Sequence, residues 1–303
     1  MTPTRVATAV FLATAIALPL AAHSAGGDSS SVMPRGLEMI RRTERGFAKA
    51  TGEIGIRNGF SMFFTDDCIA PPDSTPVRAR LLARPAPIEP RVTTLVWEPL
   101  YGDIARSVDL GYLTGPSSYQ DAEGKTQHIV YFSVWRRQLD GLWRVVLDAG
   151  MDQPSLAPEF ANGTFRAAPD PAWSDSLSPA AAAGATAELR QVDTAFLAAL
   201  GKDAKQAYAA ALAEHPRVHR DGQHPLLDRA AILAWAATQP RMLSAHVIKA
   251  DASAAGDFGW TFGACEYMKE GKLQHAGYTH VWKRDARGHW RIVADLLNAV
   301  TAP

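Results

Sequence analysis

The sequence predicts an α+β protein made of two similar units in tandem, and three observations carry this prediction. The segment VWRRQLDGLWRVVLD at Val134–Asp148 is written again, with changes, as VWKRDARGHWRIVAD at Val281–Asp295. Ahead of each copy, apolar residues first recur at helical spacing and later alternate with polar ones, as in strands. The breaks between the alternating segments are too short for parallel crossovers. Helices followed by antiparallel strands form an α+β unit with the helices on one face of the sheet.

The repetition extends beyond this hairpin and indicates a tandem duplication. The two copies are identical at eight of fifteen positions and lie 147 residues apart. GKTQH at 124–128 matches GKLQH at 271–275, and VDLGYLTGPSSY matches GDFGWTFGACEY. Farther upstream, ERGFAKA from Glu44 parallels DTAFLAA from Asp193. Four matches in the same order predict two units of one fold.

Three helices are expected at the start of each unit. In the second unit, the first has an apolar face formed by Leu189, Val192, Phe196, Leu197 and Leu200. The second is alanine-rich and runs from its N-cap Asp203 to Glu214, and the third covers 226–239, before Pro240. In the first unit the matching segments are weakened by three glycines and fall at 38–51, 56–65 and 76–84.

Four strands are expected next in each unit, because the segments are rich in Val, Thr, Tyr, Trp and Phe and end at Gly or Asp. In the first unit they fall at 92–104, 108–120, 126–138 and 142–152. In the second unit they fall at 243–253, 257–268, 274–285 and 289–299.

The chain is expected to contain four regions. Residues 1–25 combine a charged start, an apolar run and small residues, which is typical of a cleaved secretory signal peptide. The first domain is expected at 37–153 and the second at 186–300, joined by a Pro/Ala-rich linker at 154–185. A second apolar run of about 20 residues is missing, so the mature protein is expected to have no membrane span and to be periplasmic or secreted.

The composition argues against several classes of partner. The chain has 31 basic and 31 acidic residues and no basic run, so no nucleic-acid partner is expected. It has no cluster of potential metal ligands at the usual spacing and no glycine-rich phosphate loop, so neither a metal nor a cofactor is expected. Cys68 and Cys265 are expected to be small buried residues, with a single bridge between them as the alternative.

The order of three helices and a four-stranded meander, closed by VWRRQLDGLWRVVLD, resembles the nuclear transport factor 2-like fold. Within that fold it is similar to the SnoaL-like domains of exported bacterial proteins, and VDLGY and GDFGW also carry the resemblance. The resemblance implies two cone-shaped domains, each with N-terminal helices packed on a curved antiparallel sheet around a pocket. Relatives include ketosteroid isomerases, polyketide cyclases, epoxide hydrolases, dehydratases and proteins without catalytic activity, so fold alone assigns no function.

The repeated hairpin predicts which side chains face each pocket. A two-residue turn at Asp140–Gly141 pairs Ser133 with Asp148, and the same register brings His280 within hydrogen-bonding reach of Asp295. The pocket face is then formed by Tyr131, Ser133, Trp135, Val146 and Asp148 and, in the second unit, by Tyr278, His280, Trp282, Val293 and Asp295. The opposite face is expected to be core or a sheet-to-sheet interface and carries Val130, Phe132, Val134, Val145 and Leu147.

Asp295, His280 and Asp148 are the candidate acid–base residues, because a carboxylate among aromatic side chains can have a raised pKa. The candidate ligand-binding residues are Tyr131, Ser133, Trp135, Tyr278, Trp282, His128 and His275. His128 and His275 are included because they recur at one repeat position. In the structural alternative, each aspartate caps backbone groups or pairs with Arg144 or Arg291.

Two functions remain open. In the first, the exported protein is not an enzyme and binds a small amphipathic or apolar molecule in one or both pockets, while its two units pack through their apolar faces as a pseudo-dimer. In the second, it is a polyketide-cyclase- or dehydratase-like enzyme that uses Asp295 with His280. Steroid isomerisation is disfavoured, because those enzymes need a tyrosine on the first helix and neither 38–51 nor 186–200 contains one. For either function, Asp295→Asn is expected to leave folding intact and abolish binding or turnover.

Overall fold

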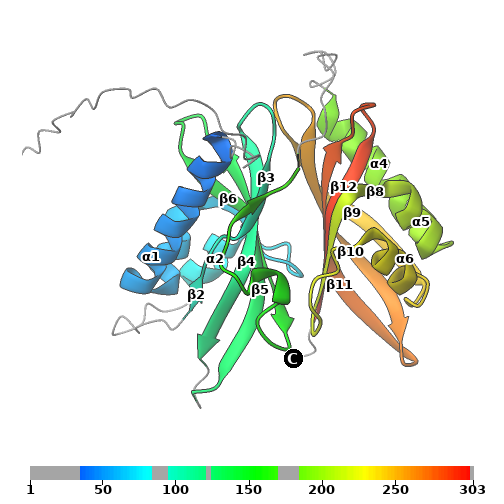
Figure 1. The fold of residues 1–303 in the computed structure, drawn as a ribbon, viewed down its shortest axis with the longest axis horizontal. Coiled ribbons are helices and arrows are strands. Elements are labelled where there is room, and N and C mark those ends of the chain that lie inside the picture. The colour runs from blue at the N-terminus through cyan, green and yellow to red at the C-terminus, as the bar shows by residue number, and fades with distance from the viewer. Residues whose placement is uncertain (1–34, 84–94, 121–123, 170–183, 301–303) are drawn as a thin grey trace, which may run out of the picture. The chain divides into compact units, whose positions relative to one another are not determined.

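A computed structural model describes four ranges of the chain, 35–83, 95–120, 124–169 and 184–300. The described residues from Arg35 onward form one compact unit that contains two β-sheets (Figure 1). The predicted signal peptide at 1–25 and the later part of the predicted linker lie outside the described residues.

The first half of the unit is built around a seven-stranded sheet with the order β1-β6-β5-β4-β3-β7, in which β2 pairs with β4. In chain order its elements are α1 (Arg35–Phe63), β1 (Phe64–Ile69), α2 (Val77–Ala83), β2 (Val96–Trp97), β3 (Tyr101–Ile104), β4 (Leu110–Gln120), β5 (Thr126–Arg137), β6 (Trp143–Gln153), η1 (Pro158–Phe160) and β7 (Arg166–Ala167). The backbone leaves the helical conformation once inside α1, at Gly55, where φ is 81°. Glycine adopts that conformation without a steric cost, so the break falls within the glycine-rich stretch that weakened the sequence pattern.

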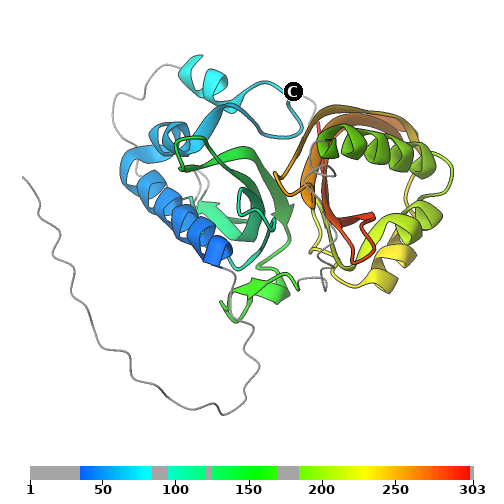
Figure 2. The same ribbon diagram turned by 90° about the horizontal axis from the view of Figure 1, so that it is seen from above.

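The second half is built around a five-stranded sheet with the order β8-β12-β11-β10-β9. Its elements are α4 (Ala185–Leu200), α5 (Ala204–Ala211), β8 (Leu212–Arg220), α6 (Arg229–Ala236), β9 (Met242–Ala252), β10 (Phe258–Lys269), β11 (Lys272–Arg284) and β12 (Trp290–Ala299). Asp203 caps α5 as predicted, because its side chain accepts a hydrogen bond of 2.9 Å from the backbone N–H of Gln206. Figure 2 shows each sheet curving around its own helices, so the predicted α+β class is confirmed.

Three strands, β1, β7 and β8, were not predicted. β1 and β8 follow α1 and α5 directly and pair in parallel with β6 and β12, whereas the sequence pattern favoured helix at 56–65 and up to Glu214. Short breaks exclude parallel pairing only between strands that follow one another in the chain, and β1 and β8 lie far from their partners in sequence. The predicted linker is also partly structured, because Phe160 is buried and β7 joins the first sheet beside β3.

The predicted pairings of Ser133 with Asp148 and of His280 with Asp295 are confirmed, but the turn is not the one expected. The N–H of Gln138 donates to the carbonyl oxygen of Leu142 at 2.8 Å, which leaves three residues in the loop, and Gly141 adopts φ 82°. A β-bulge between β5 and β6 then restores the expected register.

The bulge changes which valines face the helices. Trp135 pairs with Val145 and Val134 with Leu147, so Val146 is the extra residue. Val145 therefore packs with Trp135 under α1, and Val146 packs with Val134 on the opposite face. The second half has the same bulge, with Val293 as the extra residue. The expectation that Val146 and Val293 share a face with the aspartates was wrong, as was the placement of Val145.

Buried apolar side chains form three clusters. One lies between α1 and the first sheet and includes Phe47 and Trp135. A second lies between α4–α6 and the second sheet and includes Phe196 and Trp282. The third combines side chains from both sheets, among them Phe132, Val134, Phe258, Trp260 and Val281. Each sheet therefore buries both of its faces.

Two further predictions concern the two cysteines and the possibility of a membrane-spanning helix. Cys68 and Cys265 are free and buried, and burial raises the pKa of the Cys68 thiol well above its usual value. Within the described ranges, none of the helices combines the length and the apolar character needed to cross a bilayer.

Candidate functional site

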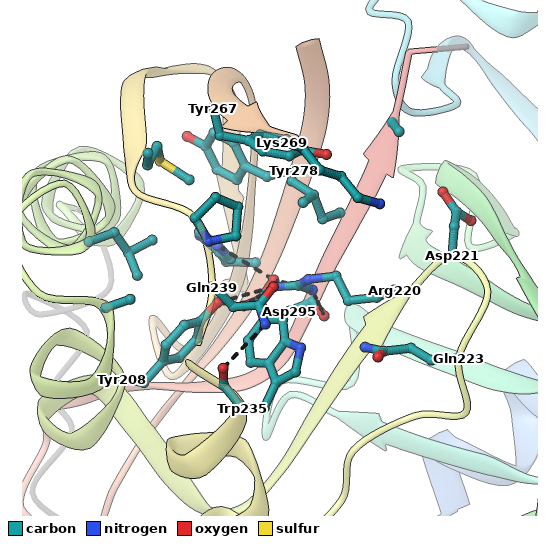
Figure 3. Close-up of a pocket in the computed structure, with 17 residues that line it drawn as sticks. Tyr208, Arg220, Asp221, Gln223, Trp235, Gln239, Tyr267, Lys269, Tyr278 and Asp295 are labelled. Carbon is teal, nitrogen blue, oxygen red and sulfur yellow. Dashed lines mark hydrogen bonds and ion pairs between the residues drawn. The ribbon is translucent and has the colours of Figure 1, made fainter. Parts of the chain in front are cut away.

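The larger of two cavities that adjoin the predicted site residues lies in the second half, between the helices and the concave face of the sheet. Its volume is about 300 Å³. Its lining exposes more apolar than polar surface. The polar side chains include Arg220 and Asp295, at what we call the floor, together with Asp221, Gln223, Gln239 and Lys269 around it (Figure 3). The side chains that line it include Leu200, Tyr208, Arg220, Trp235, Met242, Tyr267, Tyr278, His280, Asp295 and Leu297.

Asp295 at the floor is held by two residues from other elements. Arg220, at the end of β8, donates to both carboxylate oxygens of Asp295, with N···O distances of 3.0 and 3.1 Å. The Tyr208 hydroxyl, from α5, donates to Oδ2 of the same carboxylate. Figure 3 shows these three side chains pointing toward one another beside Trp235, whose ring lies 4.8 Å from the Arg220 guanidinium.

These partners keep Asp295 ionised. Burial alone raises the pKa of a carboxyl group. At Asp295 the charges of Arg220 and His280, together with the hydrogen bonds from Arg220 and Tyr208, outweigh burial and lower its pKa. A carboxylate that accepts three hydrogen bonds and has a lowered pKa is a weak base, so Asp295 is poorly suited to remove a proton from a ligand.

His280 forms its hydrogen bond with a residue that the sequence analysis did not single out as a site residue. Its Nε2 lies 3.9 Å from Oδ1 of Asp295, which is too long for a hydrogen bond. Its Nδ1 lies 2.6 Å from Oδ1 of Asp193, a buried residue of α4, and the Tyr278 hydroxyl donates to the other Asp193 oxygen at 2.9 Å. Burial lowers the pKa of His280, but the charge and hydrogen bond of Asp193 outweigh it, so the pKa is raised.

A second, smaller cavity occupies the same place in the first half and has a volume of about 160 Å³. Its lining includes two carboxyl groups, Glu44 on α1 and Asp148 on β6. Glu44 accepts hydrogen bonds of 2.7 Å from the indole N–H groups of Trp97 and Trp135, and Asp148 accepts one of 3.3 Å from the Ser133 hydroxyl. Burial raises the pKa of Glu44 to about 8 and that of Asp148 to about 7.

The structure brings most of the candidate residues to these two cavities. Asp295, His280 and Tyr278 line the larger cavity, and Asp148 and Tyr131 line the smaller one. Ser133 and Trp135 are buried behind Asp148 and Glu44, and Trp282 is buried behind His280, where its indole N–H donates to Thr261. Two candidates lie at neither cavity: His275 is exposed beside Glu266, and His128 is half-buried on β5.

Four important residues were missed by sequence reasoning. Tyr208 and Arg220 lie on elements whose contact with β12 the sequence did not reveal. Glu44 and Asp193 did leave a signal, because they occupy one position in the ERGFAKA and DTAFLAA match and both are fully buried on an apolar helix face. A buried acid at the same place in both units points to a polar site. Among the described residues, no group of three or more potential metal ligands occurs.

No family model and no curated protein matches the chain. Solved structures do match. A ketosteroid isomerase-like protein from Erwinia carotovora atroseptica is 13% identical, with a TM-score of 0.34, and the match covers 39% of this chain and 97% of that one. SalBIII, described as an epoxide hydrolase/cyclase-like enzyme in pyran ring formation in polyether salinomycin, is 11% identical, with a TM-score of 0.32 and coverage of 39% and 95%. A nuclear transport factor 2-like protein of unknown function from Pseudomonas putida KT2440 is 15% identical, with a TM-score of 0.33 and coverage of 40% and 89%. The solved structures that the chain is similar to include nuclear transport factor 2-like proteins, the group that its sequence resembles.

Proposed function

We propose that the second half binds a small amphipathic molecule in its cavity. The observation that carries this proposal is a cavity of about 300 Å³ whose apolar walls end on the buried Tyr208–Arg220–Asp295 network. Pockets for drug-sized ligands are mostly apolar clefts of about 300–1,000 Å³ with a few oriented polar groups. The apolar part of the ligand would lie against Trp235, Leu297 and Met242, and its polar end would face the network.

The hydrogen bonds and the lowered pKa of Asp295 favour a binding role for this site over a catalytic one. Its oxygens are occupied by Arg220 and Tyr208, and its pKa is lowered, so it neutralises the buried guanidinium and has little capacity left as a base. The network therefore places polar groups of fixed geometry in the lining of the cavity. Fixed polar groups beside an apolar wall select the orientation of a ligand.

A second candidate function rests on His280. Its Nδ1 is held by Asp193, while its Nε2 has no partner within hydrogen-bonding distance at Asp295, and the ring lines the cavity. A histidine oriented by a carboxylate can transfer protons at its other nitrogen. In this cyclase- or dehydratase-like alternative, the acid–base pair is His280 with Asp193 and not His280 with Asp295.

Native mass spectrometry of the purified protein tests both functions. We expect the wild type to retain a small-molecule adduct and to bind the amphipathic fluorophore 8-anilinonaphthalene-1-sulfonate. Leu297→Trp places a larger side chain in the cavity. We expect it to weaken the binding of both the retained molecule and the fluorophore by about tenfold or more, since overpacking a site costs about 1–3 kcal/mol. Leu139→Trp, in the exposed turn of the first hairpin, is the matched control and should bind like the wild type.

The outcomes separate the alternatives. Equal binding by Leu297→Trp and the wild type would contradict the proposed cavity. If the protein is a dehydratase-like enzyme, His280→Gln should retain an adduct heavier by one water, the unreacted substrate. A cyclisation that loses no atoms leaves the mass unchanged, so for that reaction the ligand released from His280→Gln should differ from the wild-type ligand in chromatographic retention. A binding protein should retain the same adduct in His280→Gln.

We also propose that the two halves are related as the subunits of a fused dimer. Reciprocal contacts support this, because in a two-fold interface each contact between residues i and j is matched by one between j and i. Lys283 Nζ lies 2.7 Å from Oδ1 of Asp103 in the first half. In the equivalent contact, Arg136 Nη1 lies 3.2 Å from Oδ2 of Asp251 in the second half.

A second pair of contacts repeats the pattern through backbone groups. The N–H of Arg106 donates to Asp257 at 3.0 Å, and the N–H of Ala254 donates to Asp109, also at 3.0 Å. Asp109 and Asp257 are equivalent in the VDLGY and GDFGW match. Two reciprocal pairs are what the fusion of a two-fold dimer would leave.

The two ion pairs are expected to differ in strength. Lys283→Met should lower the free energy of unfolding by about 3 kcal/mol or more, because Asp103 would be left buried without this counter-charge. Arg136→Met should cost about 1 kcal/mol or less, because its pair with Asp251 is partly exposed. Urea denaturation of both variants measures this difference. An unchanged unfolding free energy in Lys283→Met would contradict a packed interface between the halves.

A further inference from the structure

We propose that the smaller cavity, in the first half, binds a small organic ammonium ion between the carboxylates of Glu44 and Asp148 and an aromatic wall. This site is separate from the larger cavity, so its ligand and that of the second half are independent of each other.

The wall of the smaller cavity is aromatic. Phe47, Phe60, Trp97 and Tyr131 line it. The rings of Phe47 and Trp97 lie 4.8 Å apart, and those of Trp97 and Tyr131 lie 6.4 Å apart. A cation within about 6 Å of an aromatic face is attracted by the ring quadrupole, and quaternary ammonium ligands are recognised in this way.

Among the residues that the structure describes, neither of the two carboxyl groups pairs with a cation. The influences on Asp148 are burial and the Ser133 hydroxyl, and those that dominate at Glu44 are burial, the two indoles, Asp148 and Ser133. Two buried carboxyl groups without a counter-charge are unfavourable when ionised. A ligand cation would supply the missing charge.

The second half shows what has changed at the equivalent positions. α1 and α5 both end directly before a strand, and counting back three residues places Phe60 at the position of Tyr208. The repeated hairpin places Ser133 at the position of His280. The first half thus keeps both acids but lacks the hydroxyl of Tyr208 and the imidazole.

The first half also has no counterpart of Arg220 on β1, because β1 is shorter than β8. β8 pairs Arg217 with Ala294 and continues to Arg220. β1 pairs Ile69 with Leu147 at the equivalent position and ends there, two residues before Pro71. The place of the guanidinium is therefore not filled from this strand, and space remains beside Asp148.

Tyr131 gives an independent indication of a ligand. Its side chain lines the cavity and the residue is only 7% exposed, yet its hydroxyl has no hydrogen-bond partner among the described residues. Burial, with the nearby charges of Glu44 and Asp148 among the further causes, raises the pKa of this hydroxyl, so it stays protonated. A buried hydroxyl without a partner is rare, and a ligand in the cavity would supply one.

Isothermal titration calorimetry of the full chain with choline tests the proposal. The control ligand is 3,3-dimethylbutan-1-ol, which has the shape of choline without its charge. Choline should bind at pH 8.5 and be at least about tenfold weaker at pH 5.5, where a carboxyl group with a pKa of about 7 is mostly protonated. The neutral alcohol should bind weakly at both pH values, with ionic strength held constant by sodium chloride.

Variants locate the binding. Asp148→Asn should abolish choline binding at pH 8.5, and Glu44→Gln should weaken it. Glu53→Gln removes an exposed acid from the same helix as Glu44 and should leave binding unchanged. Circular dichroism of each variant verifies that it is folded. Should Glu44→Gln not fold, the pH dependence of the wild type and Asp148→Asn still decide the question. Three outcomes would overturn the proposal: no choline binding at pH 8.5, equal binding of the alcohol, or choline binding that survives Asp148→Asn.

Discussion

Replacing Asp295 with asparagine is expected to lower the free energy of unfolding by about 3–5 kcal/mol, the usual cost of removing one partner from a buried ion pair. Arg220 donates to both oxygens of Asp295, and the two side chains are only 12% and 2% exposed. The variant would leave the guanidinium inside the protein without its counter-charge. The sequence alone suggested that this substitution would affect binding and spare the fold, and the Arg220 contact changes that expectation.

Asp148→Asn is the matched control, because it makes the same change at the same repeat position. Within the described part of the chain Asp148 pairs with no cation, and burial raises its pKa to about 7. At pH 8 its replacement by a neutral amide is therefore expected to leave stability unchanged or increase it. Urea denaturation of both variants at pH 8 compares the two positions. Equal losses would contradict the different roles assigned to these aspartates.

The free energy of unfolding is expected to fall as the pH rises from about 4 to about 8. Glu44 and Asp148 ionise at about 8 and 7 in the folded protein but near 4.5 and 3.8 when unfolded. Between these values the folded state holds protons that the unfolded state has lost, so raising the pH favours unfolding. A difference of one pKa unit between the folded and unfolded states corresponds to about 1.4 kcal/mol. For each of the two groups, the pKa difference therefore corresponds to a free energy on the order of 4 kcal/mol.

The double variant Glu44→Gln/Asp148→Asn should remove most of this pH dependence. His280 will leave a remainder of the same sign, because its raised pKa stabilises the fold at low pH and this contribution is lost as the pH rises above about 6.5. Two groups act in the opposite sense. Burial holds the pKa of His219 well below 6.5, so its contribution makes stability rise with pH up to about 6.5, whereas Asp295, with a pKa lowered from 3.8, acts only at more acidic pH. Thermal unfolding from pH 4 to pH 8.5 measures these contributions. An equally steep curve for the double variant would assign the effect to other groups.

The sequence predicted the strand pairing well because the information is local. Alternating side chains and the position of the hairpin fix which residues lie opposite each other, so Ser133–Asp148 and His280–Asp295 could be paired in advance. The pairing was right although the turn was wrong, since the three-residue loop and the bulge at Val146 shift the register in opposite directions. The face of Val145 and Val146 could not be predicted, because an extra residue in one strand leaves no alternation signal of its own.

The sequence by itself determined the α+β class and the position of one aspartate in each hairpin, and it predicted the duplication, because these depend on repeats, periodicity and neighbouring strands. Only the tertiary structure decided what each aspartate does. Asp295 is a paired anion because β8 extends to Arg220 and α5 presents Tyr208, whereas Asp148 is an uncompensated acid because β1 ends at Ile69. Charge compensation in a buried site depends on residues that are distant in sequence, and the length of one edge strand changes it completely.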